Sequence, residues 1–302
     1  MAIAGFFPAT INAQPGSLDL SFGKGGKVIT SIGSTWDEGN AVAIQTDGKI
    51  VTAGSCTNWG TSDFALIRCN SNGTLDSTFA SGGKVITPVG NHGCNAVAIQ
   101  NDGKIVVAGS GSSGGINGFA LARYTINGRL DSTFGTAGTS IILVGSYNAI
   151  GYSLAIQTDG KLVVSGSSYN GTDNDFALIR CTSNGTLDNT FGTGGKVITP
   201  IGNAFEYGYS VAIQIDGKIV VAGSSNNGVN HDFALARYNS NGTLDNLFGT
   251  GGKLTIPIGS AADEGRSVIV QPDGKILVAG SSINGTTYDF ALVRCNGDGT
   301  MD

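Results

Sequence analysis

Carboxylate side chains are the residues of this chain best suited to chemistry. Two stand together at Asp37 and Glu38, one stands at Glu206, and another pair is formed by Asp263 and Glu264. A glycosidase needs two carboxyl groups that flank one glycosidic bond, one as the acid and one as the base or nucleophile. If the fold brings these segments together, a glycoside hydrolase is one interpretation of the sequence.

Other catalytic or metal-binding chemistry has little support. The two histidines, His92 and His231, lie far apart in the sequence, so we expect no Ser-His-Asp triad. Segment 170–175 is rich in oxygen ligands but lacks the EF-hand spacing, which favours an ordinary solvated loop. No cysteine or histidine spacing is typical of zinc. We therefore predict no catalytic residue, no metal site and no cofactor.

The charge balance excludes one class of partner. The net charge is −5, and only 13% of the residues are charged. No basic stripe is present to neutralise phosphates, so we expect no nucleic-acid partner. No apolar run approaches the ~18 residues that a transmembrane span requires.

Arginines and aspartates recur too regularly to belong to one active site. One arginine returns in each repeat, at Arg68, Arg123, Arg180, Arg237 and Arg294. A site for one ligand does not need five copies of the same residue, whereas five identical junctions between repeats do need them. A repeated ion pair or an Asp-capped turn is the simpler explanation.

The spacing of the aspartates determines the architecture. They stand at 57-residue intervals, once 55, at Asp19, Asp76, Asp131, Asp188, Asp245 and Asp302. A unit of about 57 residues is too small to bury a core alone, so such units stack against each other. We therefore predict a single domain over residues 16–302.

Each repeat reads as four short strands. In the fourth repeat these are residues 210–214, 218–223, 232–238 and 253–256. Asp216-Gly217 between the first two strands predicts a β-hairpin with a type I′ turn. No segment shows helical periodicity. Four antiparallel strands per repeat, arranged radially, are typical of a β-propeller blade, so we predict an all-β protein.

The repeat count predicts five blades. The chain opens on a fourth strand and ends after a third strand, so Lys27–Gly33 is expected to pair beside Phe290–Cys295 and close the last blade with the N-terminal strand. Such a joint removes the exposed edges of an open array. Residues 1–15 are apolar and stand outside the repeat, which predicts an N-terminal tail or the remnant of a signal peptide.

The amino-acid sequence of the repeat resembles that of a known family. The run Phe-Ala-Leu-Ala-Arg-Tyr, then Asn-Gly-Thr-Leu-Asp and Phe-Gly-Thr-Gly-Gly-Lys over residues 233–253, is similar to the delta-60 repeat, a bacterial propeller repeat. The resemblance covers about residues 16–302, and the strand order also resembles NHL-type blades. It implies a propeller fold and no particular activity.

Function is expected where the repeat is broken. The loops that enter the first strand and those between the second and third strands vary, and alternating strand direction places both sets on one face. Aromatic residues interleaved with carboxylates suit a sugar ring or a protein surface. We predict a ligand- or partner-binding site at Trp36, Glu38, Trp59, Phe205, Glu206, Tyr207 and Tyr209.

Cysteine usage leaves one pairing open. Cys69, Cys181 and Cys295 occupy a repeated position that is tyrosine in the other repeats, which indicates buried free thiols. Cys56 and Cys94 belong to the variable face of adjacent blades. They form a disulfide if their Cα atoms lie within ~7 Å of each other.

Together these observations favour a non-catalytic propeller that serves as a binding or scaffold module. We expect it to be secreted or exposed on a bacterial cell surface, with a protein or carbohydrate surface as its partner. The main alternative is a structural subunit that assembles head to tail by exchanging its N-terminal strand. A glycosidase-type enzyme is the second alternative.

Overall fold

The computed structural model describes residues 16–58, 60–90 and 93–302. The expected tail over residues 1–15, together with Trp59 and His92, lies outside the described residues. The described part of the chain forms nineteen strands and no helix, so it offers no helix that could cross a membrane. The all-β prediction is confirmed.

The strands form five antiparallel sheets, numbered here in chain order. Sheet 1 contains β1 (Asp37–Ile44), β2 (Ile50–Asn58), β3 (Thr61–Cys69) and β4 (Lys84–Thr87). Sheet 2 contains β5 (Cys94–Ile99), β6 (Ile105–Ser113), β7 (Ile116–Tyr124) and β8 (Thr139–Ile142). Sheet 3 contains β9 (Ala149–Ile156), β10 (Leu162–Tyr169), β11 (Asn174–Cys181) and β12 (Lys196–Thr199). Sheet 4 contains β13 (Glu206–Ile213), β14 (Ile219–Asn226), β15 (His231–Tyr238) and β16 (Lys253–Ile256), and sheet 5 contains β17 (Asp263–Val270), β18 (Ile276–Asn284) and β19 (Thr287–Cys295).

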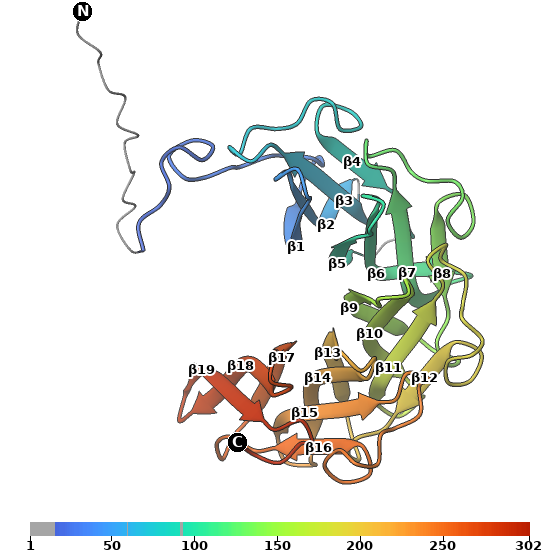
Figure 1. The fold of residues 1–302 in the computed structure, drawn as a ribbon, viewed down its shortest axis with the longest axis vertical. Helices are drawn as coiled ribbons and strands as arrows, with labels where there is room; N and C mark the ends of the chain where they lie inside the picture. Colours follow the sequence, from blue (N-terminus) through green and yellow to red (C-terminus); the bar gives the residue numbers. More distant parts are fainter. Residues whose placement is uncertain (1–15, 59, 91–92) are drawn as a thin grey trace, which may run out of the picture.

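The sheets are arranged radially around a central opening, with the first strand of each sheet nearest the centre (Figure 1). Successive inner strands pack against each other from β1 to β17. This is the propeller arrangement that four-stranded repeats predict.

The first hairpin of each sheet forms where the Asp-Gly pairs predict it, but with a different turn. In sheet 1, the Gly48 N–H donates to the Gln45 carbonyl at 2.9 Å and the Gln45 N–H donates to the Lys49 carbonyl at 2.8 Å. Gly48 has a φ of 79°, whereas Asp47 does not have a positive φ. A three-residue loop with glycine in the left-handed region therefore replaces the expected type I′ turn.

The core lies between the sheets. The third strand carries a phenylalanine whose ring packs onto glycines of the next sheet. A Cβ added at Gly166 would lie 2.8 Å from the Phe119 ring, and one at Gly280 would lie 2.9 Å from the Phe233 ring. Both rings are fully buried. Each repeat thus buries its apolar side chains only against its neighbours.

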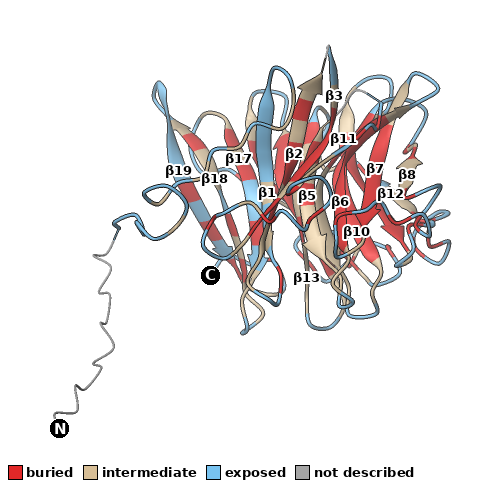
Figure 2. Cartoon of the chain, turned by 90° about the horizontal axis from the view of Figure 1, so that it is seen from above, coloured by how far each residue is buried: buried red, intermediate tan, exposed pale blue. Residues whose placement is uncertain are grey.

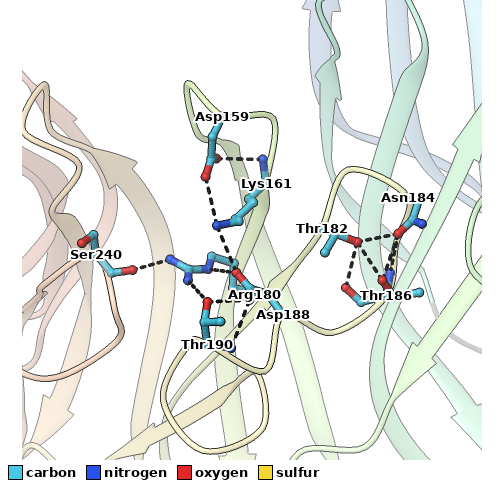
Figure 3. A network of polar contacts seen from close by, with 9 residues as sticks. All are labelled: Asp159, Lys161, Arg180, Thr182, Asn184, Thr186, Asp188, Thr190 and Ser240. Atoms are coloured by element: carbon cyan, nitrogen blue, oxygen red, sulfur yellow. Dashed lines mark hydrogen bonds and ion pairs between the residues drawn. The ribbon is translucent and has the colours of Figure 1, made fainter.

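The repeated arginines and aspartates belong to structural networks, as predicted. In sheet 3, Arg180 Nε lies 2.9 Å from Asp188 Oδ2, and Lys161 Nζ reaches the same oxygen at 3.4 Å (Figure 3). The Thr190 hydroxyl donates to Asp188 Oδ1 at 2.6 Å, and Arg180 Nη1 donates to the Ser240 carbonyl of the next repeat. The network therefore closes a turn and ties two repeats together.

The predicted closure of the last sheet is not present. In the described chain, no strand pairs with the outer edge of β19, so sheet 5 has three strands. Residues Lys27–Gly33 lie on sheet 1 instead. Lys84 Nζ of β4 donates to the Ser31 carbonyl at 2.7 Å, and the Ile32 N–H donates to the Asp37 carboxylate at 2.9 Å. These bonds hold the segment on sheet 1, and the central opening separates sheet 1 from sheet 5 (Figure 1).

Candidate functional site

One end of the sheets carries both sets of variable loops. Because the strands are antiparallel, the loops between second and third strands and the connections from one sheet to the next lie at the same end. We call this end the loop face and the opposite end, with the Asp-Gly turns, the turn face.

Each inner strand has an irregularity just below the loop face. The strand register shifts between Gly39 and Ala41 in β1 and between Gly265 and Ser267 in β17, and β5, β9 and β13 shift at the equivalent place. A bulge leaves one residue unpaired and re-aims its side chain. The bulge residues lie five positions before the strand-end glutamines and are Asn40, Asn95, Tyr152, Tyr209 and Arg266.

The first two bulge residues join neighbouring sheets. Asn40 Nδ2 donates to the Cys94 carbonyl at 3.0 Å, and Asn95 Nδ2 donates to the Gly151 carbonyl at 2.8 Å. In the last three sheets the asparagine is replaced by tyrosine, tyrosine and arginine. The three replacements therefore occur at a position that, in the first two sheets, bonds one sheet to the next.

These replacements form an aromatic cluster across sheets 3 to 5. The rings of Tyr152 and Tyr209 lie 5.1 Å apart, and Tyr207 stacks on Tyr209 at 5.7 Å with an interplanar angle of 13°. His231 continues the row, 6.2 Å from Tyr207. The Arg266 guanidinium lies 4.2 Å from the centre of the Tyr209 ring. We call these five residues the tyrosine cluster.

Burial shifts the pKa values of two tyrosines in the cluster. Burial raises the pKa of Tyr209 to about 12, although the charge of Arg266 acts in the opposite direction. Burial also raises the pKa of Tyr152. Both phenols therefore stay protonated at neutral pH and offer hydroxyl groups as hydrogen-bond donors. Arg266 pairs with Glu264 on the same strand, so the cluster presents one cation and one anion beside the rings.

Glu206 differs from the prediction. Its side chain is fully buried, and its carboxylate accepts hydrogen bonds from the Ile201 N–H at 2.7 Å and from the Gly202 N–H. Burial raises its pKa. Glu206 therefore anchors the loop that enters β13 and is not available to a ligand.

Asp37 and Asp263 anchor the equivalent loops of sheets 1 and 5. Asp37 accepts from the Gly33 N–H at 2.8 Å, and Asp263 accepts from the Ile258 N–H at 2.8 Å. Of the carboxylates considered for glycoside hydrolysis, Glu38 and Glu264 carry no such loop bonds. They lie on β1 and β17, on the two sides of the opening (Figure 1).

The structure brings together only part of the predicted site. Tyr207 and Tyr209 stack on each other, and Phe205 is partly exposed on the loop that precedes them. Trp36 is 70% exposed but belongs to sheet 1. Arg266 was not predicted, although the change from asparagine to arginine at its repeat position is a signal that the sequence contains.

The predicted disulfide is not formed. Cys56 and Cys94 are buried free thiols, as are the other three cysteines. Cys94 Sγ donates to the Ala96 carbonyl at 3.3 Å, whereas Cys56 Sγ accepts from Asn58 Nδ2 at 3.7 Å. The two sulfur atoms therefore have separate partners. Within the described ranges, no group of three or more acidic, histidine or cysteine residues is placed to hold a metal ion.

A sequence model of one protein family matches every repeat. The family is described as "Domain of unknown function (DUF5122) beta-propeller", and the matches cover residues 45–79, 100–134, 157–191, 214–248 and 271–302. The match confirms that the repeats belong to a β-propeller repeat family. The family carries this description and not the delta-60 name. A comparison with curated proteins found no match.

Solved structures resemble this chain at low sequence identity, and the first of those described here shares its fold. A polysaccharide lyase, PL25 ulvan lyase bound to -[GlcA(1-4)Rha3S]-, has a TM-score of 0.54 and 12% identity over 90% of this chain and 71% of that one. A protein of unknown function from Bacteroides caccae has a TM-score of 0.47 and 13% identity over 87% and 80% of the two chains. An endo-arabinase from Bacteroides thetaiotaomicron VPI-5482 has a TM-score of 0.44 and 12% identity over 88% and 97%.

Proposed function

This chain belongs to the DUF5122 beta-propeller family, whose description assigns no activity, and we propose that it is a non-catalytic binding or scaffold module. Its binding site is the tyrosine cluster on the inner strands below the loop face. The observation that carries the proposal is one repeat position, which holds a bonded asparagine in sheets 1 and 2 and Tyr152, Tyr209 and Arg266 in sheets 3 to 5.

A carbohydrate chain is the ligand class that fits this site best. Tyrosine rings are apolar on their faces and carry a hydroxyl group at the edge, which suits rings that are apolar on one side and polar at the rim. Arg266 and Glu264 add a donor and an acceptor beside them. A protein surface rich in exposed side-chain rings is the alternative partner. Such a module is expected to work outside the cell or on a bacterial surface.

Binding to an immobilised panel of glycans tests the proposal. The panel includes glucuronate-containing oligosaccharides, because the ulvan lyase of similar fold is bound to one. Tyr209→Ala is expected to weaken binding of any glycan found by at least about tenfold, or roughly 1.4 kcal/mol. Leu247→Ala is the control, since Leu247 is exposed on the turn face.

Two results would contradict the proposal. One is equal affinity of Tyr209→Ala and the unchanged protein. The other is breakdown of a bound glycan, which would favour the glycosidase alternative. Trp36→Ala, tested beside them, shows whether the ligand reaches across to sheet 1.

A structural role is the second candidate, and the unpaired edge of β19 is the observation that favours it. We propose that Lys27–Thr30 supplies the fourth strand of sheet 5. Within one chain this pairing closes a five-bladed ring. Between chains it builds a head-to-tail assembly.

A further inference from the structure

A second pair of tyrosines lies on the loop face of sheet 3. The rings of Tyr147 and Tyr169 are 5.6 Å apart with an interplanar angle of 74°, which is an edge-to-face contact. We call these two residues the outer pair. Neither belongs to the repeat, because the other sheets carry no aromatic residue at the equivalent positions. Those positions hold Thr35, Ala204 and Ala261 in sheets 1, 4 and 5 for Tyr147, and Thr57, Ser112, Asn226 and Ile283 for Tyr169.

Backbone contacts hold the outer pair in place. The Tyr169 hydroxyl donates to the Gly171 carbonyl at 3.0 Å, and the Tyr169 N–H donates to the Asn148 carbonyl at 2.9 Å. Gly171 has a φ of 107°, and an added Cβ there would lie 3.2 Å from the Tyr147 ring. The Tyr147 ring therefore lies against the turn between β10 and β11, where a glycine leaves room for it.

The outer pair is accessible although sheet 3 has a neighbour on both sides. Sheet 3 packs against sheet 2 through β6 and β9 and against sheet 4 through β10 and β13. Tyr147 is nevertheless 49% exposed. Figure 2 shows buried strands in the middle of the molecule and exposed loops at their ends. The exposure of Tyr147 therefore comes from its place in a loop, and grouped aromatic side chains in such a place are typical of an interaction site.

The strand register places the outer pair beside the tyrosine cluster. Tyr169 on β10 pairs directly with Asn174 on β11, so the two side chains lie on the same face of sheet 3. Asn174 Nδ2 donates to the Tyr207 hydroxyl of sheet 4 at 3.4 Å. Asn174 therefore joins the outer pair to the tyrosine cluster across the junction of sheets 3 and 4. The resulting row consists of Tyr147, Tyr169, Asn174, Tyr207, Tyr209 and Tyr152.

The row is longer than a single sugar ring. Its measured steps between ring centres are 5.6 Å within the outer pair, 5.7 Å from Tyr207 to Tyr209 and 5.1 Å from Tyr209 to Tyr152. Apolar ring faces alternate along it with hydroxyl groups and one amide group. A ligand built of successive rings that are apolar on one side and polar at the rim matches such a row.

The charges beside the outer pair favour an uncharged ligand at this end. Asp173 and Asp175 flank Asn174, and both carboxyl groups accept from Asn170 Nδ2. Lys253 lies near enough to Asp175 to lower its pKa, although burial raises that pKa more strongly. In the part of the chain that the structure describes, Asp173 has no ion-pair partner. An anionic sugar would be repelled by Asp173, whereas a neutral sugar can donate a hydroxyl hydrogen bond to it.

We propose that the outer pair is a second subsite, and that the ligand is a linear, neutral oligosaccharide chain long enough to contact both the outer pair and the tyrosine cluster. This inference rests on the proposed function, since the tyrosine cluster is its inner subsite. A chain that fills both subsites gains the second contact without a second loss of translational and rotational freedom. Affinity therefore rises with chain length, and the rise depends on the outer pair.

Calorimetric titration with chains of two lengths tests the proposal. The probes are cellobiose and cellohexaose, mannobiose and mannohexaose, and xylobiose and xylohexaose. We expect at least one hexamer to bind at least about tenfold more tightly than its dimer. Tyr147→Ala and Tyr169→Ala should reduce the affinity for that hexamer to roughly that for the dimer and leave the dimer unaffected. Tyr209→Ala should weaken the binding of both lengths.

The control variants separate the outer pair from other effects of length. A longer chain offers more ways to occupy one subsite, but that gain would survive the loss of the outer pair. Tyr288→Ala is the matched control, because Tyr288 is an exposed tyrosine at the loop-face end of another sheet. Tyr169→Phe keeps the ring without its bond to Gly171 and should retain the dependence on length. Circular dichroism establishes that each variant folds, and Tyr147→Ala alone decides if Tyr169→Ala does not.

Three results would overturn the inference. They are equal affinities for hexamer and dimer, a dependence on length that Tyr147→Ala retains, and no binding of any hexamer. The proposed function fails on a different result, which is that Tyr209→Ala leaves the binding of every glycan of the panel unchanged. A panel glycan that requires Tyr209 while no neutral hexamer binds would therefore reject the outer subsite and keep the tyrosine cluster as a binding site.

Discussion

At the scale of single residues, replacing a buried arginine is expected to destabilise the protein strongly. Arg180 bonds Asp188 in its own repeat and the Ser240 carbonyl in the next one. Its guanidinium also lies 4.6 Å from the centre of the Phe191 ring. Removing it leaves Asp188 as a buried charge with only Lys161 and hydrogen-bond donors near it.

We therefore predict that Arg180→Met lowers the free energy of unfolding by about 3–5 kcal/mol, as expected when one partner of a buried ion pair is lost. Urea unfolding measures the change. Arg129→Met is the control, because Arg129 is exposed on a turn and its replacement should stay within about 0.5 kcal/mol. Equal effects of the two substitutions would show that the network does not stabilise the fold.

The aspartates of these networks predict a loss of stability in acid. Hydrogen bonds from Thr133, with the charges of Lys104 and Arg123, hold the pKa of Asp131 well below its usual range despite burial. The folded protein thus binds this proton less readily than the unfolded chain, whose Asp has a pKa of about 3.9. The stabilisation is complete above that value and is lost as the pH falls below about 4. Thermal unfolding from pH 7 to pH 2.5 should follow this course, and Asp131→Asn should show a shallower fall. An unchanged slope would assign the acid sensitivity to other groups.

At the scale of elements, the corners before the fourth strands of sheets 1 and 2 each place an alanine in the left-handed region, Ala80 with a φ of 44° and Ala137. Ala137 has a φ of 52°, where the equivalent Gly82, Gly194 and Gly251 have values of 59–62°. An L-residue pays about 1–2 kcal/mol in this left-handed region, and glycine does not. Sheet 2 keeps all four strands, so the alanine changes the corner and not the sheet.

Exchanging the two residue types should change stability in opposite directions. Ala137→Gly is expected to raise the free energy of unfolding by roughly 1 kcal/mol. Gly194→Ala should lower it by a similar amount, since an added Cβ there meets no atom within 4 Å and only the φ changes the energy. Chemical unfolding of both variants measures the pair. A loss of stability in Ala137→Gly would show that the methyl group stabilises the corner by more than the strain costs.

The elements were predictable from the sequence, and the site only in part. Strands and hairpins follow from local patterns, so the Asp-Gly pairs place the first hairpin of each sheet even though the turn itself differs. Tyr209 could be found as a break in the repeat. The role of Glu206 could not, because its two bonds to backbone N–H groups depend on how the preceding loop folds back. The grouping of Arg266 with Tyr209 likewise requires the packing of β17 on β13.

At the scale of the whole molecule, the sheets form a row in which each one contacts only its neighbours. Stability in such an array is a sum of repeat and junction contributions. The loss of stability on replacing one residue type should therefore depend on how fully that residue is buried in a junction between sheets. Phe176 is buried between sheets 3 and 4, whereas Phe290 is exposed on sheet 5.

We predict that Phe176→Ala lowers the free energy of unfolding by about 3–5 kcal/mol, the usual cost of deleting a buried phenylalanine. In dilute protein, Phe290→Ala should change it by less than about 0.5 kcal/mol, because no neighbour covers the ring. Urea unfolding measures both variants. A large effect of Phe290→Ala would mean that its side chain is buried against another part of the protein.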